Sequence, residues 1–172
     1  MPIYNSKKNK HTNKKSKKKN VINSLCILNT KTIKGYIAFS QKNGKVLVSY
    51  NITGLSDGDH GFHIHEYGDL RNKCKNAGGH FNPHKKHHGS LKSKHRHVGD
   101  LGNIKSKNKK AIGSFFDKHL KLDGINSIIG RSVVVHKFKD DLGLGTNKSK
   151  QTGNAGPRIA CGIIGHINKS QK

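Results

Sequence analysis

Residues 33–52, IKGYIAFSQKNGKVLVSYNI, contain two runs in which apolar and polar residues alternate, joined by Asn43-Gly44. Alternation with a period of two predicts strands that bury one face. Asn-Gly between two such runs is a strong signal for a two-residue hairpin. No window of ten or more residues keeps the 3.6-residue period of a helix, so the sequence predicts an all-β antiparallel sandwich or barrel. Further short apolar runs lie at 62–66, 111–116, 132–138 and 158–164.

The chain is short and strongly basic. Its 172 residues hold 34 Lys and Arg against 9 Asp and Glu, a net charge of +25. Residues 1–20 contain eight lysines and no acidic residue, which predicts a disordered lysine-rich arm before a single domain at 21–172. Two interpretations of the charge stay open: a coding bias toward lysine, asparagine and isoleucine, or a polyanionic partner such as nucleic acid, contacted through the arm.

The distribution of apolar residues bears on location. No run of about 18 apolar residues is present, so no membrane partner is expected. The first 20 residues are polar and basic, unlike a secretory signal. The expected location is therefore the cytoplasm, with association to nucleic acid or a particle through residues 1–20 as the alternative that the charge leaves open.

Histidine is the residue type that indicates function, because the chain has 13 of them. His63 and His65 flank Ile64 in a predicted strand, so both imidazoles project from one face. Two long loops are predicted at 67–96 and 139–157, and loops of that length are often functional. Imidazole clusters suit copper or zinc, so metal binding explains the pattern better than isolated polar strand positions do. Candidate ligands in or beside the loops are His80, His84, His87, His88, His95, His97, Asp100 and His136.

Five ordered motifs resemble those of the copper/zinc superoxide dismutase family. They lie at 61–69, 77–83, 97–103, 133–143 and 153–162, and the likeness runs from about residue 25 to residue 167. The resemblance implies an antiparallel Greek-key β-barrel or sandwich, immunoglobulin-like, with two long functional loops. It also implies an enzyme that converts superoxide to oxygen and hydrogen peroxide by electron transfer through copper, with a structural zinc ion.

The resemblance implies a ligand set for one copper and one zinc ion per subunit. His80 would bridge the two ions as an imidazolate. His87 stays an alternative to His88, although His88 has the family's spacing of eight residues from His80 and is followed by Gly89. The implied copper ligands are His63, His65, His80 and His136. The implied zinc ligands are His80, His88, His97 and Asp100, a closed set typical of a structural ion.

Residues outside the ligand set also acquire roles from the resemblance. Asp140 would join a copper histidine to a zinc histidine and fix their ring orientations. Arg158 would pair with the anionic substrate at the channel mouth, and Thr152 would narrow the channel. Cys74 and Cys161 would form the family's intrasubunit disulfide.

The resemblance implies partners as well as ligands. A homodimer is expected through the segments near Gly68, Gly130 and 163–165, although His166 stands where an apolar residue is common. A copper chaperone is a further expected partner. Two competing functions are copper delivery by a dismutase-like domain and polyanion binding by an inactive one. The intact ligand set and Arg158 argue against both.

Overall fold

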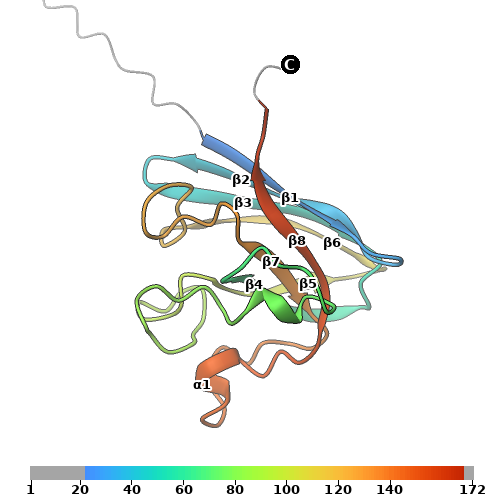
Figure 1. Ribbon diagram of the computed structural model, residues 1–172. Helices are drawn as coiled ribbons and strands as arrows, with labels where there is room; N and C mark the ends of the chain where they lie inside the picture. The colour runs from blue at the N-terminus through green and yellow to red at the C-terminus, as the bar shows by residue number, and fades with distance from the viewer. Residues whose placement is uncertain (1–21, 169–172) are drawn as a thin grey trace, which may run out of the picture.

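The computed structural model describes residues 22–168, which form an antiparallel β-barrel with two long loops at one end (Figure 1). The predicted arm at 1–20 lies outside the described residues. The strands of the described chain are β1 (Ile22–Asn29), β2 (Lys34–Lys42), β3 (Lys45–Thr53), β4 (Gly58–His65), β5 (Asp100–Ser106), β6 (Lys110–Asp117), β7 (Ser132–His136) and β8 (Arg158–His166).

The strand order is β5-β4-β7-β8-β1-β2-β3-β6, with every pair antiparallel. The chain therefore crosses from β3 to β4 and from β6 to β7 between strands that are not neighbours in the sheet, which is the Greek-key pattern. The end strands β5 and β6 are joined by a short turn at Lys107–Lys110, where the barrel nearly closes. The all-β fold expected from the sequence is confirmed.

The hairpin that opens the fold has the predicted geometry. Asn43 (φ 51°) and Gly44 (φ 75°) both adopt left-handed backbone conformations, as a type I′ turn requires. Ile37 and Phe39 of β2 pack inside the barrel against Val46 and Val48 of β3, and all four are at most 1% exposed. The alternating pattern thus places one face of this hairpin in the core.

Two features of the fold differ from the sequence prediction. Neither β1 nor β5 was among the predicted runs; in β5, Gly102 and Asn103 interrupt the apolar pattern. The loops carry short helices, a 3₁₀ turn at Lys75–Ala77 and α1 at Ser149–Thr152, too short to give a helical period. Within residues 22–168, no helix is long and apolar enough to cross a membrane.

Candidate metal centre

Four buried imidazoles converge on the outer side of the barrel wall, beneath the two loops. His63 and His65 come from β4 and His136 from the end of β7, and the loop after β4 brings His80 beside them. One ring nitrogen from each lies within 4.8 Å of all the others. Because Phe62 and Ile64 alternate with the β4 histidines and fill the core, the strand itself turns both imidazoles outward.

Backbone carbonyls fix two of these rings. The Nδ1–H of His65 donates to the carbonyl of Gly78 (2.9 Å), and the Nδ1–H of His136 donates to that of Gly156 (2.9 Å). A carbonyl only accepts, so each Nδ1 is protonated and each Nε2 is the free base. The two Nε2 atoms lie 3.4 Å apart. Two lone pairs therefore face the middle of the group, as metal ligands require.

His63 presents its other nitrogen to the group. Its Nε2–H donates to the Asp140 carboxylate (2.7 Å), and its Nδ1 is buried without a hydrogen-bond partner among the described residues. A buried polar atom left unpaired is costly. A cation among the four imidazoles would satisfy this nitrogen, so the donor set fits copper.

A second group surrounds one carboxylate oxygen. The Nδ1 atoms of His80, His88 and His97 lie 2.8, 2.9 and 3.0 Å from Oδ1 of Asp100. The His88 contact lacks hydrogen-bond geometry, which leaves a second buried nitrogen without a hydrogen bond. The Asp100 Oδ2 accepts from the backbone N–H of Gly89 and of His97. Three nitrogens and one fixed carboxylate form the set that a tetrahedral zinc ion takes.

His80 belongs to both groups. Its Nδ1 lies at Asp100, and its ring centroid is 4.0 Å from that of His63 and 5.0 Å from that of His65. Each group therefore receives one of the two ring nitrogens of His80. This arrangement allows one imidazole to contact two cations.

Burial keeps the copper-side imidazoles in their neutral form. It lowers the pKa of His63 and His65 well below the usual value and that of His136 to about 4. On the other side burial opposes protonation of His88, but the neighbouring Asp100 and Asp140 carboxylates raise its pKa to about 9. Without metal, His88 in the second group therefore carries a proton at neutral pH, and a zinc ion would displace that proton.

Asp140 joins the two groups. One carboxylate oxygen lies 2.7 Å from Nε2 of His63 and the other 2.8 Å from Nε2 of His88. The Asn103 side chain holds the Asp140 backbone from both sides, donating to its carbonyl (2.9 Å) and accepting from its N–H (2.7 Å). At Gly153, any Cβ would collide with the Asp140 carboxylate, so that position must be glycine.

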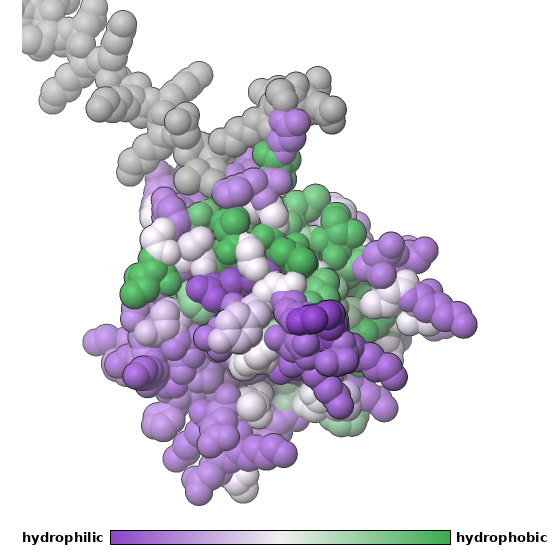
Figure 2. All heavy atoms as spheres, in the orientation of Figure 1, coloured by the Kyte–Doolittle hydropathy of each residue, from purple (hydrophilic) through white to green (hydrophobic). Residues whose placement is uncertain are grey.

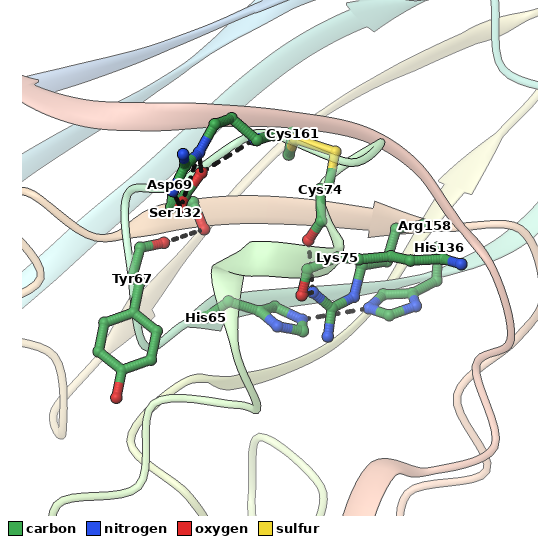
Figure 3. The surroundings of a disulfide bond; sticks show 10 residues. His65, Tyr67, Asp69, Cys74, Lys75, Ser132, His136, Arg158 and Cys161 are labelled. Atoms are coloured by element: carbon green, nitrogen blue, oxygen red, sulfur yellow. Dashed lines mark hydrogen bonds and ion pairs between the residues drawn. A yellow bond between two sulfur atoms is a disulfide. The ribbon is translucent and has the colours of Figure 1, made fainter.

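A cavity of about 460 Å³ opens beside the first group. His65, His80 and His136 lie at its base, and Thr152 and Arg158 line its wall. The Arg158 guanidinium donates to the carbonyls of Cys74 (2.5 Å), Lys75 (3.1 Å) and Gly78 (2.5 Å), as Figure 3 shows in part. These bonds use three of its five N–H groups, so two remain for an anion. Among residues 22–168, no acidic side chain lines the cavity.

The disulfide fixes the segment that holds Arg158. Cys74 and Cys161 are bonded, as expected, and connect the loop after β4 to β8, 87 positions away in sequence (Figure 3). Because Arg158 lies three residues before Cys161 and bonds the carbonyl of Cys74, the same link that joins loop and strand positions the guanidinium.

The structure brings the implied metal ligands together, with Asp140, Thr152 and Arg158 beside them. His88 is buried in the second group, whereas His87 is exposed and outside it. His84 is exposed and hydrogen-bonded to Asn126, and His95 is exposed. None of these three belongs to either group within the described residues.

Three polar residues near the site, two of them buried and Asn103 half-buried, had no assigned role from the sequence. Asn103 holds Asp140, and the Nδ1–H of His60 donates to the carbonyl of His136 (2.8 Å). Arg96 is 3% exposed, pairs with Asp117 and donates to the carbonyls of the His97–Asp100 turn. Asn103 and His60 bond backbone groups distant in sequence, and Arg96 bonds the carbonyls of an irregular turn, so no spacing pattern marks these residues.

Comparisons with known proteins agree with this geometry. Residues 33–164 match the family model described as copper/zinc superoxide dismutase. The chain belongs to the copper/zinc superoxide dismutase family. As a member it is an oxidoreductase that converts superoxide to oxygen and hydrogen peroxide, with copper and zinc as its cofactors.

Individual relatives cover most of the dismutase chain. Superoxide dismutase [Cu-Zn] 5 of Dictyostelium discoideum is 52% identical over 147 residues, which span 83% of this chain and 97% of the relative. The enzyme of Saccharomyces cerevisiae is 52% identical over 141 residues, 79% and 92% of the two chains. A crystal structure described as that of the clock protein EA4 superposes with a TM-score of 0.83 at 45% identity, covering 86% of this chain and 96% of that one.

Proposed function

We propose a specific division of roles among the residues of this dismutase. His63, His65 and His136, with His80 as the shared ligand, hold copper, and His80, His88, His97 and Asp100 hold zinc. The observation that carries the proposal is that His80 belongs to both clusters of ligand atoms. Bound copper would supply the one-electron oxidation and reduction that dismutation needs.

The protein's own groups prepare the site for a small anion. Arg158 offers its two remaining N–H groups to superoxide and is kept in place by three backbone carbonyls. Thr152 narrows the cavity from the side of α1. Asp140 holds His63 and His88 in the tautomers that direct their Nδ1 atoms to the two metals.

Three histidine variants test the roles. In His136→Ala the dismutation rate measured by pulse radiolysis should vanish while one zinc ion per chain remains by elemental analysis. His88→Ala should lose zinc. His87→Ala is the matched control, because this neighbouring histidine is exposed, and it should keep both metals and full activity. A variant at His87 that loses zinc, or one at His88 that keeps it, would refute the assignment.

We also propose that the enzyme forms a homodimer through the expected segments. Gly68 packs so closely on the carbonyl of Gly130 that a Cβ would collide with it, which leaves this surface flat. Tyr67 (54% exposed) and Ile163 (49% exposed) offer apolar contact area beside it, and His166 is exposed at the rim. Sedimentation equilibrium of Ile163→Asp should give a monomer, whereas Ile125→Asp, at an exposed position on another surface, should not.

Two further proposals concern the chain's organisation and partners. Residues 1–20 are a basic arm and residues 21–172 are the dismutase domain. The family match at 33–164 supports a domain within 21–172 but does not fix where that domain begins or ends. A copper chaperone loads the metal, a role supported by the burial of all four copper-side imidazoles. Comparing copper uptake in cells with and without the chaperone would test the second proposal.

A further inference from the structure

A second cavity, of about 300 Å³, lies at the end of β6. The start of β3, the loop before β5 and the end of β6 contribute its walls, and it shares no lining residue with the cavity at the metal centre. We call it the β6 cavity. The residues that define it are Lys45, Lys92, Arg96, Phe116, Asp117 and Lys118.

The β6 cavity lies apart from the surface that we expect to form the dimer. In the strand order, β1, β2 and β3 separate β6 from β8, which carries Ile163 of the dimer surface. Figure 2 shows hydrophobic residues gathered over the upper part of the molecule, where Figure 1 places β1 and the end of β8. The β6 cavity is lined by lysines instead, and the proposed dimer contact leaves it accessible.

A buried ion pair contributes to the wall of the β6 cavity. Arg96 is 3% exposed and Asp117 2%, and the Arg96 guanidinium donates to Oδ2 of Asp117. The other oxygen, Oδ1, accepts from the backbone N–H of His119 (2.6 Å) and of Leu120 (2.8 Å). Both carboxylate oxygens are therefore occupied, and Arg96 balances the charge of Asp117, so this carboxylate does not prevent an anion from entering.

Arg96 keeps hydrogen-bonding capacity beyond this pair. Its Nη1 donates to carbonyls of the His97–Asp100 turn, and its Nη2 uses one of two N–H groups for Asp117. Its Nε–H is buried and has no hydrogen-bond partner among residues 22–168. A buried donor without an acceptor costs free energy. An acceptor bound in the cavity that Arg96 lines would reduce this cost.

Three lysines and an aromatic ring complete the β6 cavity. Lys45, Lys92 and Lys118 are exposed, and none of them forms an ion pair within the described part of the chain. Phe116 is 64% exposed and pairs with Leu47 of β3, which places it next to Lys45 in the neighbouring strand. Lysines attract phosphate groups, and an exposed ring stacks on a flat apolar group.

We propose that the β6 cavity binds a small phosphate monoester that carries an aromatic group. The phosphate contacts the lysines, with Arg96 as a further donor, and the aromatic group contacts Phe116. A volume of about 300 Å³ is in the range of small-molecule pockets, which favours a free ligand over a segment of another protein. No metal ligand lines this cavity, so the site lies beyond dismutation.

An NMR titration of the full chain, loaded with zinc and with reduced copper, tests the proposal with phenyl phosphate and inorganic phosphate as probes. Phenyl phosphate should shift the amide signals of Lys92, Phe116 and Lys118. It should bind about fivefold more tightly than inorganic phosphate, because only phenyl phosphate contacts the ring. In Phe116→Ala the two probes should bind equally. The double change Lys92→Gln and Lys118→Gln should weaken the binding of both probes about fivefold.

Matched variants elsewhere separate the β6 cavity from general basicity. Phe138 is 51% exposed and lies outside the cavity, so Phe138→Ala should keep the preference for phenyl phosphate. Changing the exposed Lys85 and Lys86 to Gln removes the same charge from a loop and should leave both affinities within about twofold of the wild type. Dismutase activity and the thermal midpoint should stay at wild-type values in all these variants.

Four results would each overturn the proposal. The first is a set of shifted signals confined to the metal cavity, around Thr152. The second is equal binding of the two probes to the wild type, and the third is an unchanged preference in Phe116→Ala. The fourth is tighter binding of a phosphotyrosyl peptide than of phenyl phosphate, which would mean that the ligand is part of a protein partner.

Discussion

Replacing Asp140 by asparagine should weaken zinc binding while leaving the barrel folded. The carboxylate accepts a hydrogen bond from His63 through one oxygen and from His88 through the other. An amide of the same shape has one accepting oxygen, and its NH₂ group would face an imidazole N–H. One of the two rings therefore loses its orienting partner. Loss of such a partner typically costs 10–100-fold in metal affinity, about 1.4–2.8 kcal/mol.

The assay is competition for zinc against a chromophoric chelator, with Asp141→Asn as the control. Asp141 is the adjacent carboxylate, but it bonds Ser149, Asn154 and the N–H of Gly143 rather than any histidine. We expect the zinc affinity of Asp140→Asn to fall at least tenfold and that of Asp141→Asn to change much less. A zinc affinity within twofold of the wild type in Asp140→Asn, or an equal loss in the control, would refute the orienting role.

Three further predictions concern pH, salt and thiol chemistry. The metal-free protein should be most stable near pH 6.5. The pKa of His88 is raised to about 9 in the folded state, so stability is lost as pH rises from about 6.5 through 9. The pKa of His136 is lowered to about 4 in the folded state, so stability is also lost as pH falls from about 6.5 toward 4. Urea midpoints at pH 5, 6.5 and 9 would check this, and a monotonic trend would contradict it. Lys148 lines the cavity, whereas Lys150 does not. At low salt, Lys148→Gln should therefore lower the superoxide rate constant about twofold, more than Lys150→Gln does, and the difference should disappear at high salt. Equal effects of the two changes in pulse radiolysis would contradict this prediction. Burial raises the pKa of the Cys26 thiol to about 12, so a disulfide reagent at pH 8 should label it only after unfolding, and rapid labelling of the native protein would show that the strand opens.

The fold followed from the sequence wherever alternation was clean. The hairpin of β2 and β3 appeared with its turn in place, because Asn43 and Gly44 accept the left-handed backbone that few residue types tolerate. β5 was not predicted, because Gly102 and Asn103 interrupt its alternating pattern. Tertiary contacts rather than local preference make this segment a strand.

At the metal site, too, local sequence patterns predict some positions, whereas others depend on contacts that form only in the folded chain. Strand alternation alone predicts that His63 and His65 share a face, and the structure has them there. Choosing His88 over His87 needed the family spacing, because in an irregular loop neither residue has a predictable direction. Asn103 and Arg96 hold groups at the site through bonds that only the folded chain creates. Sequence reasoning thus finds residue types suited to a metal but not the groups that orient them.

The two clusters differ in how far apart along the chain their members lie. His80, His88, His97 and Asp100 fall within 21 residues, whereas the copper-side set runs from His63 to His136, 73 positions apart. Closing a short loop costs less entropy than closing a long one, and local contacts form sooner during folding. On a growing chain, the zinc set is complete before the last copper-side histidine has been synthesised. We therefore expect zinc capture to precede completion of the copper site, which needs His136 of β7 in place.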